Sequence, residues 1–294
     1  MRRLIAKQAR RSLRSLRDLI LLLTVARGSV PVVYFDRQLN VGDAITPYLV
    51  QKLTGRPVYR VRSNVVVHLL AVGSIIHEVR CRSLVWGSGI LDAERLPGRD
   101  TLERARFLAV RGRLTQQLLA ASGADVAAAA IGDPAVVMPL FYEPKRSDQA
   151  YRIGLVPHYV DRETPLVRYM ASLPGISLID VRQQPEPFID DICQCELVVS
   201  SSLHGLILAD SYRVPNLWVR FSDGLVGGEF KFHDYYSTTD APDSRITLIT
   251  DQVAADECIA ALPKQAGVAR YLGDPEDLIA AFPFNRFERG HTHA

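Results

Sequence analysis

The sequence has few of the residues that mark a metal or redox protein. Its 294 residues include only four cysteines, at positions 81, 193, 195 and 258. No two of them have the spacing of a zinc or dithiol motif, and no histidine motif accompanies them. We therefore expect free thiols in a reducing compartment, no metal site and no cofactor.

A large excess of charge of one sign is also missing. The formal net charge is only +3, and much of the basic excess lies in the first segment, at Arg2, Arg3, Lys7, Arg10, Arg11, Arg14 and Arg17. The rest of the chain is close to neutral and has no aromatic-basic module, which argues against a nucleic-acid-binding protein. A hydrophobic content of 48% is typical of a globular enzyme.

A long hydrophobic run is absent as well. The apolar stretch DLILLLTVA, residues 18–26, is too short to span a bilayer, Asp18 interrupts it, and Arg27-Gly28-Ser29 is a poor signal-peptide cleavage site. We expect residues 1–30 to form a basic amphipathic helix. Two interpretations stay open: a helix that lies on an anionic membrane surface, or a structural helix that caps the first domain.

From residue 31 the chain alternates between short apolar runs and helical stretches, which predicts an α/β fold with parallel sheets. A first domain is expected at 31–145, with strands at 31–36, 57–61, 65–73, 83–87 and 107–112 and helices at 44–54 and 114–122. The proline-punctuated segment 139–150 is typical of a linker. A second domain is expected at 146–284, with strands at 151–158, 176–181, 196–201 and 216–220, helices near 165–172, 187–194 and 203–213, and closing helices at 251–262 and 275–282. Residues 285–294 are predicted to be a flexible tail. Two such units predict a cleft at the carboxyl ends of their strands.

Two glycine-containing motifs follow strands of the first domain. In LNVGD, residues 39–43, Gly42 allows close backbone approach, and Asp43 is either a helix cap or an acid that faces the cleft. In VWGSGI, residues 85–90, Gly87 and Ser88 form either a plain tight turn or a loop whose amides bind an anion.

An arginine pair marks the end of the last predicted strand of the first domain. Arg111 and Arg113 flank Gly112, and a guanidinium there suits a carboxylate or phosphate, because its donors form a planar fork. In the following IGDP motif we expect Asp133 to fix a turn and orient an arginine.

The most informative segment is VVSSSLHG, residues 198–205. A buried strand brings Ser200, Ser201 and Ser202 to the first turn of an apolar helix, which gathers hydroxyls and free amides around an anion site. His204 lies in that turn, where a histidine is suited to general acid or base catalysis. The alternative is a histidine that only satisfies the helix cap.

Taken in order, LNVGD, VWGSGI, VRGRLT, IGDP, IGLVPHY and SSSLHGLILADSYRVPNLW resemble the polysaccharide pyruvyl transferase family, from about residue 33 to residue 237. The segment FKFHDYY, residues 230–236, is similar to the branch that acts on exopolysaccharide repeat units. The resemblance implies two Rossmann-like domains in a GT-B-like arrangement. It also implies transfer of the pyruvyl group of phosphoenolpyruvate, the co-substrate, to a sugar diol, which forms a pyruvate ketal and releases phosphate.

The resemblance and the motifs together define a predicted site. We expect His204 and Asp43 to be catalytic. Donor binding is expected from Arg111, Arg113, Ser200, Ser201, Ser202, Leu203, Gly87 and Ser88, and acceptor binding from Asn40, Lys231 and Tyr235. Many relatives carry arginine where this chain has Ser202, so anion binding must depend more on hydroxyls, helix amides or another base, such as Arg113, Lys145, Arg220 or Lys231.

The resemblance further implies a lipid-linked oligosaccharide acceptor and a cytoplasmic enzyme with peripheral contact to the inner membrane. Two other functions fit the same pattern: a nucleotide-sugar glycosyltransferase, and a noncatalytic carbohydrate-binding subunit of the same fold. Fold analogy alone does not separate them.

Overall fold

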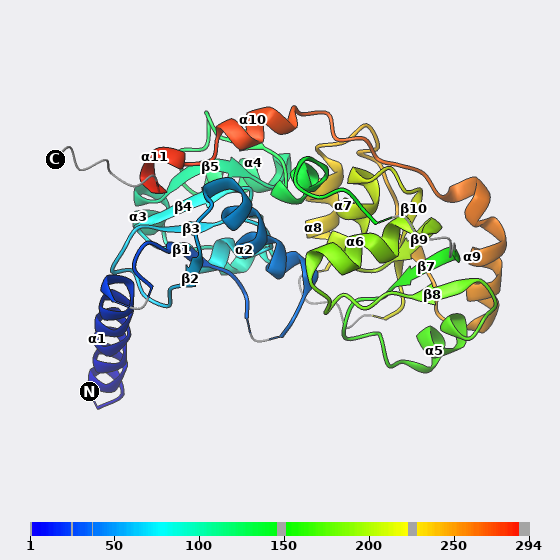
Figure 1. Cartoon of the computed structure of the whole chain (residues 1–294), viewed down its shortest axis with the longest axis horizontal. Coiled ribbons are helices and arrows are strands. Elements are labelled where there is room, and N and C mark those ends of the chain that lie inside the picture. Colours follow the sequence, from blue (N-terminus) through cyan, green and yellow to red (C-terminus); the bar gives the residue numbers. More distant parts are fainter. Residues whose placement is uncertain (1, 25, 37, 146–150, 223–227, 288–294) are drawn as a thin grey trace.

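The protein has two α/β halves that lie side by side (Figure 1). The computed structural model describes residues 2–24, 26–36, 38–145, 151–222 and 228–287, with side chains from residue 12 onward. Each half contains one parallel sheet flanked by helices. The α/β class predicted from the sequence is therefore confirmed.

The first sheet has six strands in the order β2-β1-β3-β4-β5-β6, and all neighbours are parallel. Buried aliphatic residues such as Val32, Leu69 and Val85 form its central strands, as expected for a sheet covered on both faces. The strands are β1 (Val30–Val33), β2 (Val58–Arg60), β3 (His68–Leu70), β4 (Ser83–Trp86), β5 (Arg106–Val110) and β6 (Ala130–Ile131).

The second sheet has five parallel strands in the order β11-β10-β9-β7-β8. Its middle strand β9 ends at Ser200, directly before the serine-histidine segment. The strands are β7 (Tyr151–Val156), β8 (Ile176–Leu178), β9 (Cys195–Ser200), β10 (Asn216–Arg220) and β11 (Thr247–Leu248).

The helices begin and end with local signals that the sequence supplies. Asn40 caps α2, because its side chain accepts a hydrogen bond from the Gly42 amide, and Gly55 ends that helix in the left-handed conformation. The helices are α1 (Arg2–Leu23), α2 (Val41–Thr54), α3 (Arg99–Arg104), α4 (Arg113–Ala121), α5 (Pro165–Ala171), α6 (Pro185–Cys193), α7 (Leu203–Ser211), α8 (Phe230–Tyr236), α9 (Gln252–Gln265), α10 (Pro275–Ala280) and α11 (Phe284–Phe287), with 3₁₀ turns η1 (Ile76–Glu78), η2 (Ala93–Arg95) and η3 (Pro134–Leu140).

One hydrophobic core joins the two halves. Buried residues of α2 and η3 from the first half and of α6 and α7 from the second belong to the same cluster. Polar contacts cross the same boundary: the Val41 amide donates to the Val181 carbonyl at 2.7 Å, and the Tyr48 hydroxyl donates to Glu186 at 2.8 Å. The amino terminus of α2 is therefore held against the second half.

The chain returns to the first half at its end. The Trp86 indole donates to the Leu278 carbonyl at 2.7 Å, and Phe282 packs edge-on against Trp86. Residues 275–284 therefore pack with the first sheet, although the prediction grouped them with the second domain (Figure 1). The predicted tail is also shorter, because α11 reaches Phe287 and buries it; residues 288–294 lie outside the described part.

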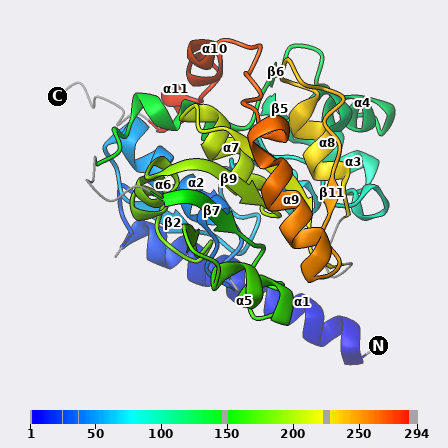
Figure 2. The ribbon, with the colours of Figure 1, turned by 90° about the vertical axis from the view of Figure 1, so that its right-hand side faces the viewer.

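Helix α1 extends away from the body in two perpendicular views (Figures 1 and 2). Among the described residues, no helix combines the length and apolar character needed to cross a membrane.

Candidate functional site

Most of the predicted site residues lie where the strands of both sheets end. Asn40, Gly87, Arg111 and Asp133 follow strands of the first sheet, and Ser200 ends β9 of the second sheet directly before Ser201–His204. Two residues that were not predicted, Gly73 and His158, lie at further strand ends. Because the carboxyl ends of parallel strands share one edge, the sheets bring these segments together.

His204 lies directly on the backbone of Gly42. A Cβ atom at Gly42 would lie 2.0 Å from His204 Nδ1, which is far inside the closest approach of two nonbonded atoms. Only glycine leaves room for the imidazole here. The interpretation of Gly42 as a point of close approach therefore has a specific partner, and that partner comes from the other half.

Asp133 holds the opposite side of the same ring. One carboxylate oxygen accepts a hydrogen bond from the Ala135 amide at 3.0 Å and begins η3. The other lies 3.7 Å from His204 Nε2, and both atoms are buried without a hydrogen-bond partner within the described residues. The turn predicted for Asp133 is present, but the free carboxylate oxygen faces a histidine rather than an arginine.

Asp43 completes this cluster from the first turn of α2. Burial raises the pKa of its carboxyl from 3.8 to about 7, opposed by the nearby His204 and by a hydrogen bond from the Phe35 backbone. An acid with this pKa exchanges protons near neutral pH, as a catalytic acid or base must.

Arg111 is completely buried and forms an ion pair with Asp234 of α8. Its Nε donates to Asp234 Oδ2 at 2.8 Å, while its terminal nitrogens donate to Ser74 Oγ at 2.5 Å and the Ile90 carbonyl at 2.9 Å. The guanidinium packs on Gly89, where a Cβ atom would overlap it. Arg111 thus borders the site as part of a filled network, and its role in binding a donor stays a prediction.

Lys231 is the neighbouring cation and has a different environment. It lies one turn before Asp234 on α8, so both side chains project from the same face of the helix. It is 9% exposed, and its ammonium contacts the Phe232 ring, with no hydrogen bond or ion pair to the part of the chain that the structure describes. Burial lowers its pKa to about 8, and Arg111 adds to this shift.

His158 and Ser201 continue the cluster on the second half. Burial, followed by the charge of Lys231, lowers the pKa of His158 to about 4. The His158 amide donates to Ser201 Oγ at 2.8 Å. Lys231 therefore lies close enough to affect His158, and Arg111 close enough to affect Lys231, while Asp43 and His204 form a second charged group.

The three predicted serines have different environments. Ser200 Oγ bonds to the Val156 and Ser202 carbonyls and to the Ser202 amide, so it stabilises the turn itself. Ser202 caps α7 without a side-chain hydrogen bond to the helix, which leaves the first-turn amides without a cap ligand. Leu203 is buried beside it.

Of the remaining predicted residues, Gly87 and Ser88 stabilise a turn, whereas Tyr235 and Arg113 make contacts with other groups. Gly87, at φ +87°, packs against Pro134, and the Ser88 hydroxyl donates to the Gly73 carbonyl at 2.8 Å. Tyr235 is buried, and its hydroxyl donates to Asp210 at 2.8 Å. Arg113 is exposed and lines a cavity of about 200 Å³ with Asp274 and Asp277.

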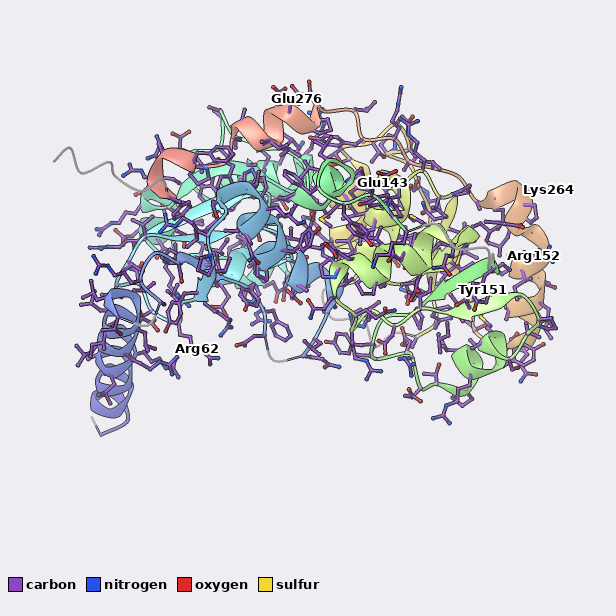
Figure 3. The ribbon with its side chains drawn as sticks, viewed as in Figure 1. Arg62, Glu143, Tyr151, Arg152, Lys264 and Glu276 are labelled. Carbon is purple, nitrogen blue, oxygen red and sulfur yellow. The ribbon has the colours of Figure 1, made fainter. Side chains whose placement is uncertain are left out.

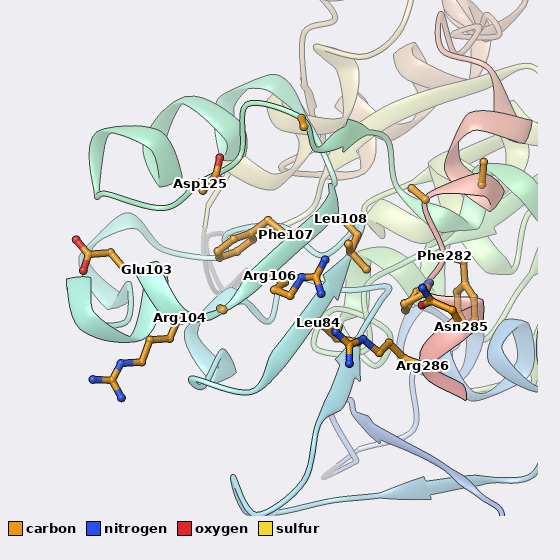
Figure 4. A pocket seen from close by; sticks show the side chains of 15 residues that line it. Leu84, Glu103, Arg104, Arg106, Phe107, Leu108, Asp125, Phe282, Asn285 and Arg286 are labelled. Atoms are coloured by element: carbon orange, nitrogen blue, oxygen red, sulfur yellow. The ribbon is translucent and has the colours of Figure 1, made fainter. Parts of the chain in front are cut away.

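A larger cavity, of about 810 Å³, lies elsewhere. It is lined by residues at the start of β5 and by the segment between α10 and α11 (Figure 4). This is the amino-terminal side of the first sheet, opposite to the charged cluster. Phe107 and Phe282 line it beside exposed arginines, and it contains none of the predicted catalytic residues.

Residues that could hold a metal do not come together in the described ranges, where no group of three histidine, cysteine or carboxylate side chains has a suitable arrangement. Arg60 acts on the Asp43 carboxyl, and Arg111 acts on Lys231.

Sequence analysis did not identify Asp234 and His158 as part of this cluster, and it assigned Asp133 to an arginine rather than to His204. The motifs IGDP, VPHY and FKFHDYY contain all three residues, so the residue types were visible. Their partners are distant in the chain, and no local pattern identifies them.

The polysaccharide pyruvyl transferase family matches residues 40–223, more than half of the chain. An uncharacterized protein of Acanthamoeba polyphaga mimivirus is 30% identical over 224 residues, which cover 73% of this chain and 76% of that protein. The succinoglycan biosynthesis protein ExoV of Rhizobium meliloti (strain 1021) is 31% identical over 174 residues, 58% of this chain and 53% of ExoV. An uncharacterized Klebsiella pneumoniae protein of known structure aligns with a TM-score of 0.44 at 13% identity, over 81% of this chain and 99% of that one.

Proposed function

We propose a reaction from one established premise: this chain belongs to the polysaccharide pyruvyl transferase family. The proposed reaction transfers the pyruvyl group of phosphoenolpyruvate to two hydroxyls of a sugar in an exopolysaccharide repeat unit, forms a pyruvate ketal and releases phosphate. The observation that carries it is the packing of His204 on the Gly42 backbone, with one oxygen of Asp133 at 3.7 Å from Nε2 and the buried Asp43 carboxyl close enough for its pKa to respond to the imidazole. The two halves would act as a GT-B-like pair, with donor and acceptor meeting between them.

The donor requires a site for a carboxylate and a phosphate. The uncapped first turn of α7 offers amides, and Ser202 precedes it without a side-chain hydrogen bond to the helix. Arg111 is held by Asp234, whereas Lys231 has no ion-pair partner among the described residues. We assign Lys231 to the donor anion, in place of the acceptor role expected from the sequence. A charge-assisted hydrogen bond from this ammonium would be stronger than one from a neutral donor.

His204 is the proposed acid. A proton delivered to the methylene carbon of phosphoenolpyruvate makes the central carbon electrophilic. A sugar hydroxyl then attacks that carbon, and the second hydroxyl closes the ketal as phosphate leaves. Asp133 would stabilise the protonated imidazole, because its free oxygen already faces Nε2.

Asp43 is the proposed base for the sugar hydroxyl. With a pKa of about 7, the carboxyl is partly ionised at neutral pH and able to accept that proton. Asn40 lies three residues earlier, and its side-chain oxygen accepts the hydrogen bond from the Gly42 amide that caps α2. Its side-chain amide nitrogen would therefore be the group that donates a hydrogen bond to the sugar acceptor. A lipid-linked oligosaccharide as acceptor, on the cytoplasmic side of a membrane, fits this reaction.

The reaction is tested by incubating the purified chain with an oligosaccharide acceptor and either phosphoenolpyruvate or a panel of nucleotide sugars. Release of inorganic phosphate from phosphoenolpyruvate, with mass spectrometry showing a pyruvate ketal on the sugar, supports the proposal. Consumption of a nucleotide sugar alone identifies a glycosyltransferase, and saccharide binding without consumption of either donor identifies a binding subunit.

Histidine variants test the mechanism separately. His204→Ala should abolish turnover at a temperature where circular dichroism shows a folded chain, although its melting temperature should fall because removal of a buried ring leaves a cavity. His77→Ala is the matched control, because this half-buried histidine lies on η1 outside the cluster. Full turnover in His204→Ala would remove His204 from the mechanism.

A further inference from the structure

Helix α1 carries a stripe of large apolar side chains that nothing in the described structure covers. Leu13, Leu16, Ile20 and Leu23 are 50–66% exposed. Their spacing of three, four and three residues places them on one face of the helix. Single exposed leucines are common on soluble proteins, but four on one helical face form a contact surface.

The other face of α1 is fixed to the protein. Asp18 is fully buried, and its carboxylate accepts hydrogen bonds from the Arg62 amide at 2.9 Å and the Tyr59 hydroxyl at 3.3 Å. Leu22 packs on the core of the first half. Arg62 is labelled beside α1 in Figure 3. The apolar stripe therefore has a set orientation.

The charge of this helix indicates what covers the stripe. Residues 2–17 include seven basic residues and no acidic one, whereas the rest of the chain has no basic excess. A second α1 would bring like charges together, so pairing between two copies is electrostatically unfavourable. An anionic lipid surface offers both an apolar layer for the leucines and phosphates for the arginines.

We propose that α1 docks the protein on an anionic membrane surface, with Leu13, Leu16, Ile20 and Leu23 inserted at the headgroup boundary and the basic residues against lipid phosphates. The buried contacts of Asp18 hold the first half at a fixed angle to that surface. This inference is independent of the reaction proposed above.

The test is cosedimentation of the full chain with two kinds of vesicle, phosphatidylcholine alone and phosphatidylcholine mixed with phosphatidylglycerol. We expect binding to the anionic vesicles only, weakened by added salt. The variant Leu13→Ser/Leu16→Ser/Ile20→Ser should lose binding at least 100-fold, because each exposed leucine contributes apolar area to insertion. Arg14→Gln/Arg17→Gln should lose roughly fivefold per residue.

Matched control variants distinguish binding through α1 from nonspecific adsorption through other exposed apolar side chains. Val253 on α9 and Leu272 are as exposed as the α1 leucines, so Val253→Ser/Leu272→Ser should bind vesicles like the unaltered chain. Equal binding to neutral and anionic vesicles would refute the charge argument. Absence of sedimentation, together with a dimer that the leucine variant dissociates in light scattering, would assign the stripe to a second copy and overturn the proposal.

Discussion

Replacing Gly42 by alanine is the sharpest test of the site, because it moves one ring and little else. The added Cβ would lie 2.0 Å from His204 Nδ1, and real Cβ contacts essentially never fall below 3.0 Å. The imidazole must therefore move by about 1 Å. A displacement of that size at a catalytic group lowers the rate by roughly 100-fold. Stability should change little, since alanine in a helix is about 1 kcal/mol better than glycine and offsets part of the repacking.

The assay is the turnover number for phosphate release from phosphoenolpyruvate, measured beside a thermal melt and the NMR resonances of the His204 imidazole. Gly98→Ala is the control, because no atom lies within 4 Å of a Cβ built there. We expect Gly42→Ala to shift the imidazole resonances and lose about two orders of magnitude in rate, and Gly98→Ala to do neither. A folded Gly42→Ala with the full rate would refute the placement of His204 in the reaction.

Three further predictions follow from the charged groups. Lys231→Met should raise KM for phosphoenolpyruvate about 10- to 100-fold, as expected for loss of a charged hydrogen bond, while Lys264→Met at the exposed end of α9 leaves KM unchanged; equal KM values in the Lys231 variant and wild type would remove Lys231 from donor binding. Because the folded pKa of Asp43, about 7, lies above the unfolded value of 3.8, the native state binds this proton more tightly. Wild-type stability relative to Asp43→Asn should therefore fall as pH rises from about 4 through about 7, and thermal melts with a pH-independent difference would contradict this. Arg111→Met should lower the free energy of unfolding by about 3–5 kcal/mol in urea titrations. Arg111→Met/Asp234→Leu should recover only part of this loss, because it removes the unpaired charge but leaves the Thr115 amide and hydroxyl without an acceptor. A single variant as stable as wild type would show that the ion pair contributes nothing.

The parallel sheets could be predicted because the relevant signals are local. Short apolar runs such as Val30–Val33 and Leu84–Trp86 alternate with capped helices, and this period identifies the fold class without any knowledge of contacts. The return of α10 to the first sheet could not be predicted in this way. It depends on the Trp86 contact with Leu278, and these residues are 192 positions apart.

In the site, too, the residue types could be predicted from the sequence, whereas their contact partners could not. Asp43 and His204 were identifiable because a strand end followed by a helix start is where such side chains meet a cleft. The state of Arg111 was not identifiable, because its carboxylate partner is 123 residues away on α8, in a segment whose helix was not expected. A guanidinium that suits a ligand also suits a buried aspartate, and residue type does not distinguish the two.

The Arg111–Asp234 ion pair contributes more to the positioning of α8 than to the free energy of unfolding. Removing two charges from water costs several kcal/mol per ion, so the ion pair by itself stabilises the fold no more than an apolar pair of similar size would. An apolar pair would not form hydrogen bonds, so it would not fix the relative orientation of the two elements. Asp234 accepts from the Thr115 amide at 2.7 Å and the Thr115 hydroxyl at 2.6 Å as well as from Arg111, which fixes α8 against α4 of the first half in one register. Lys231 lies one turn away on the same face of α8, so the bonds that occupy Arg111 are also the bonds that position Lys231, whose charge acts on His158.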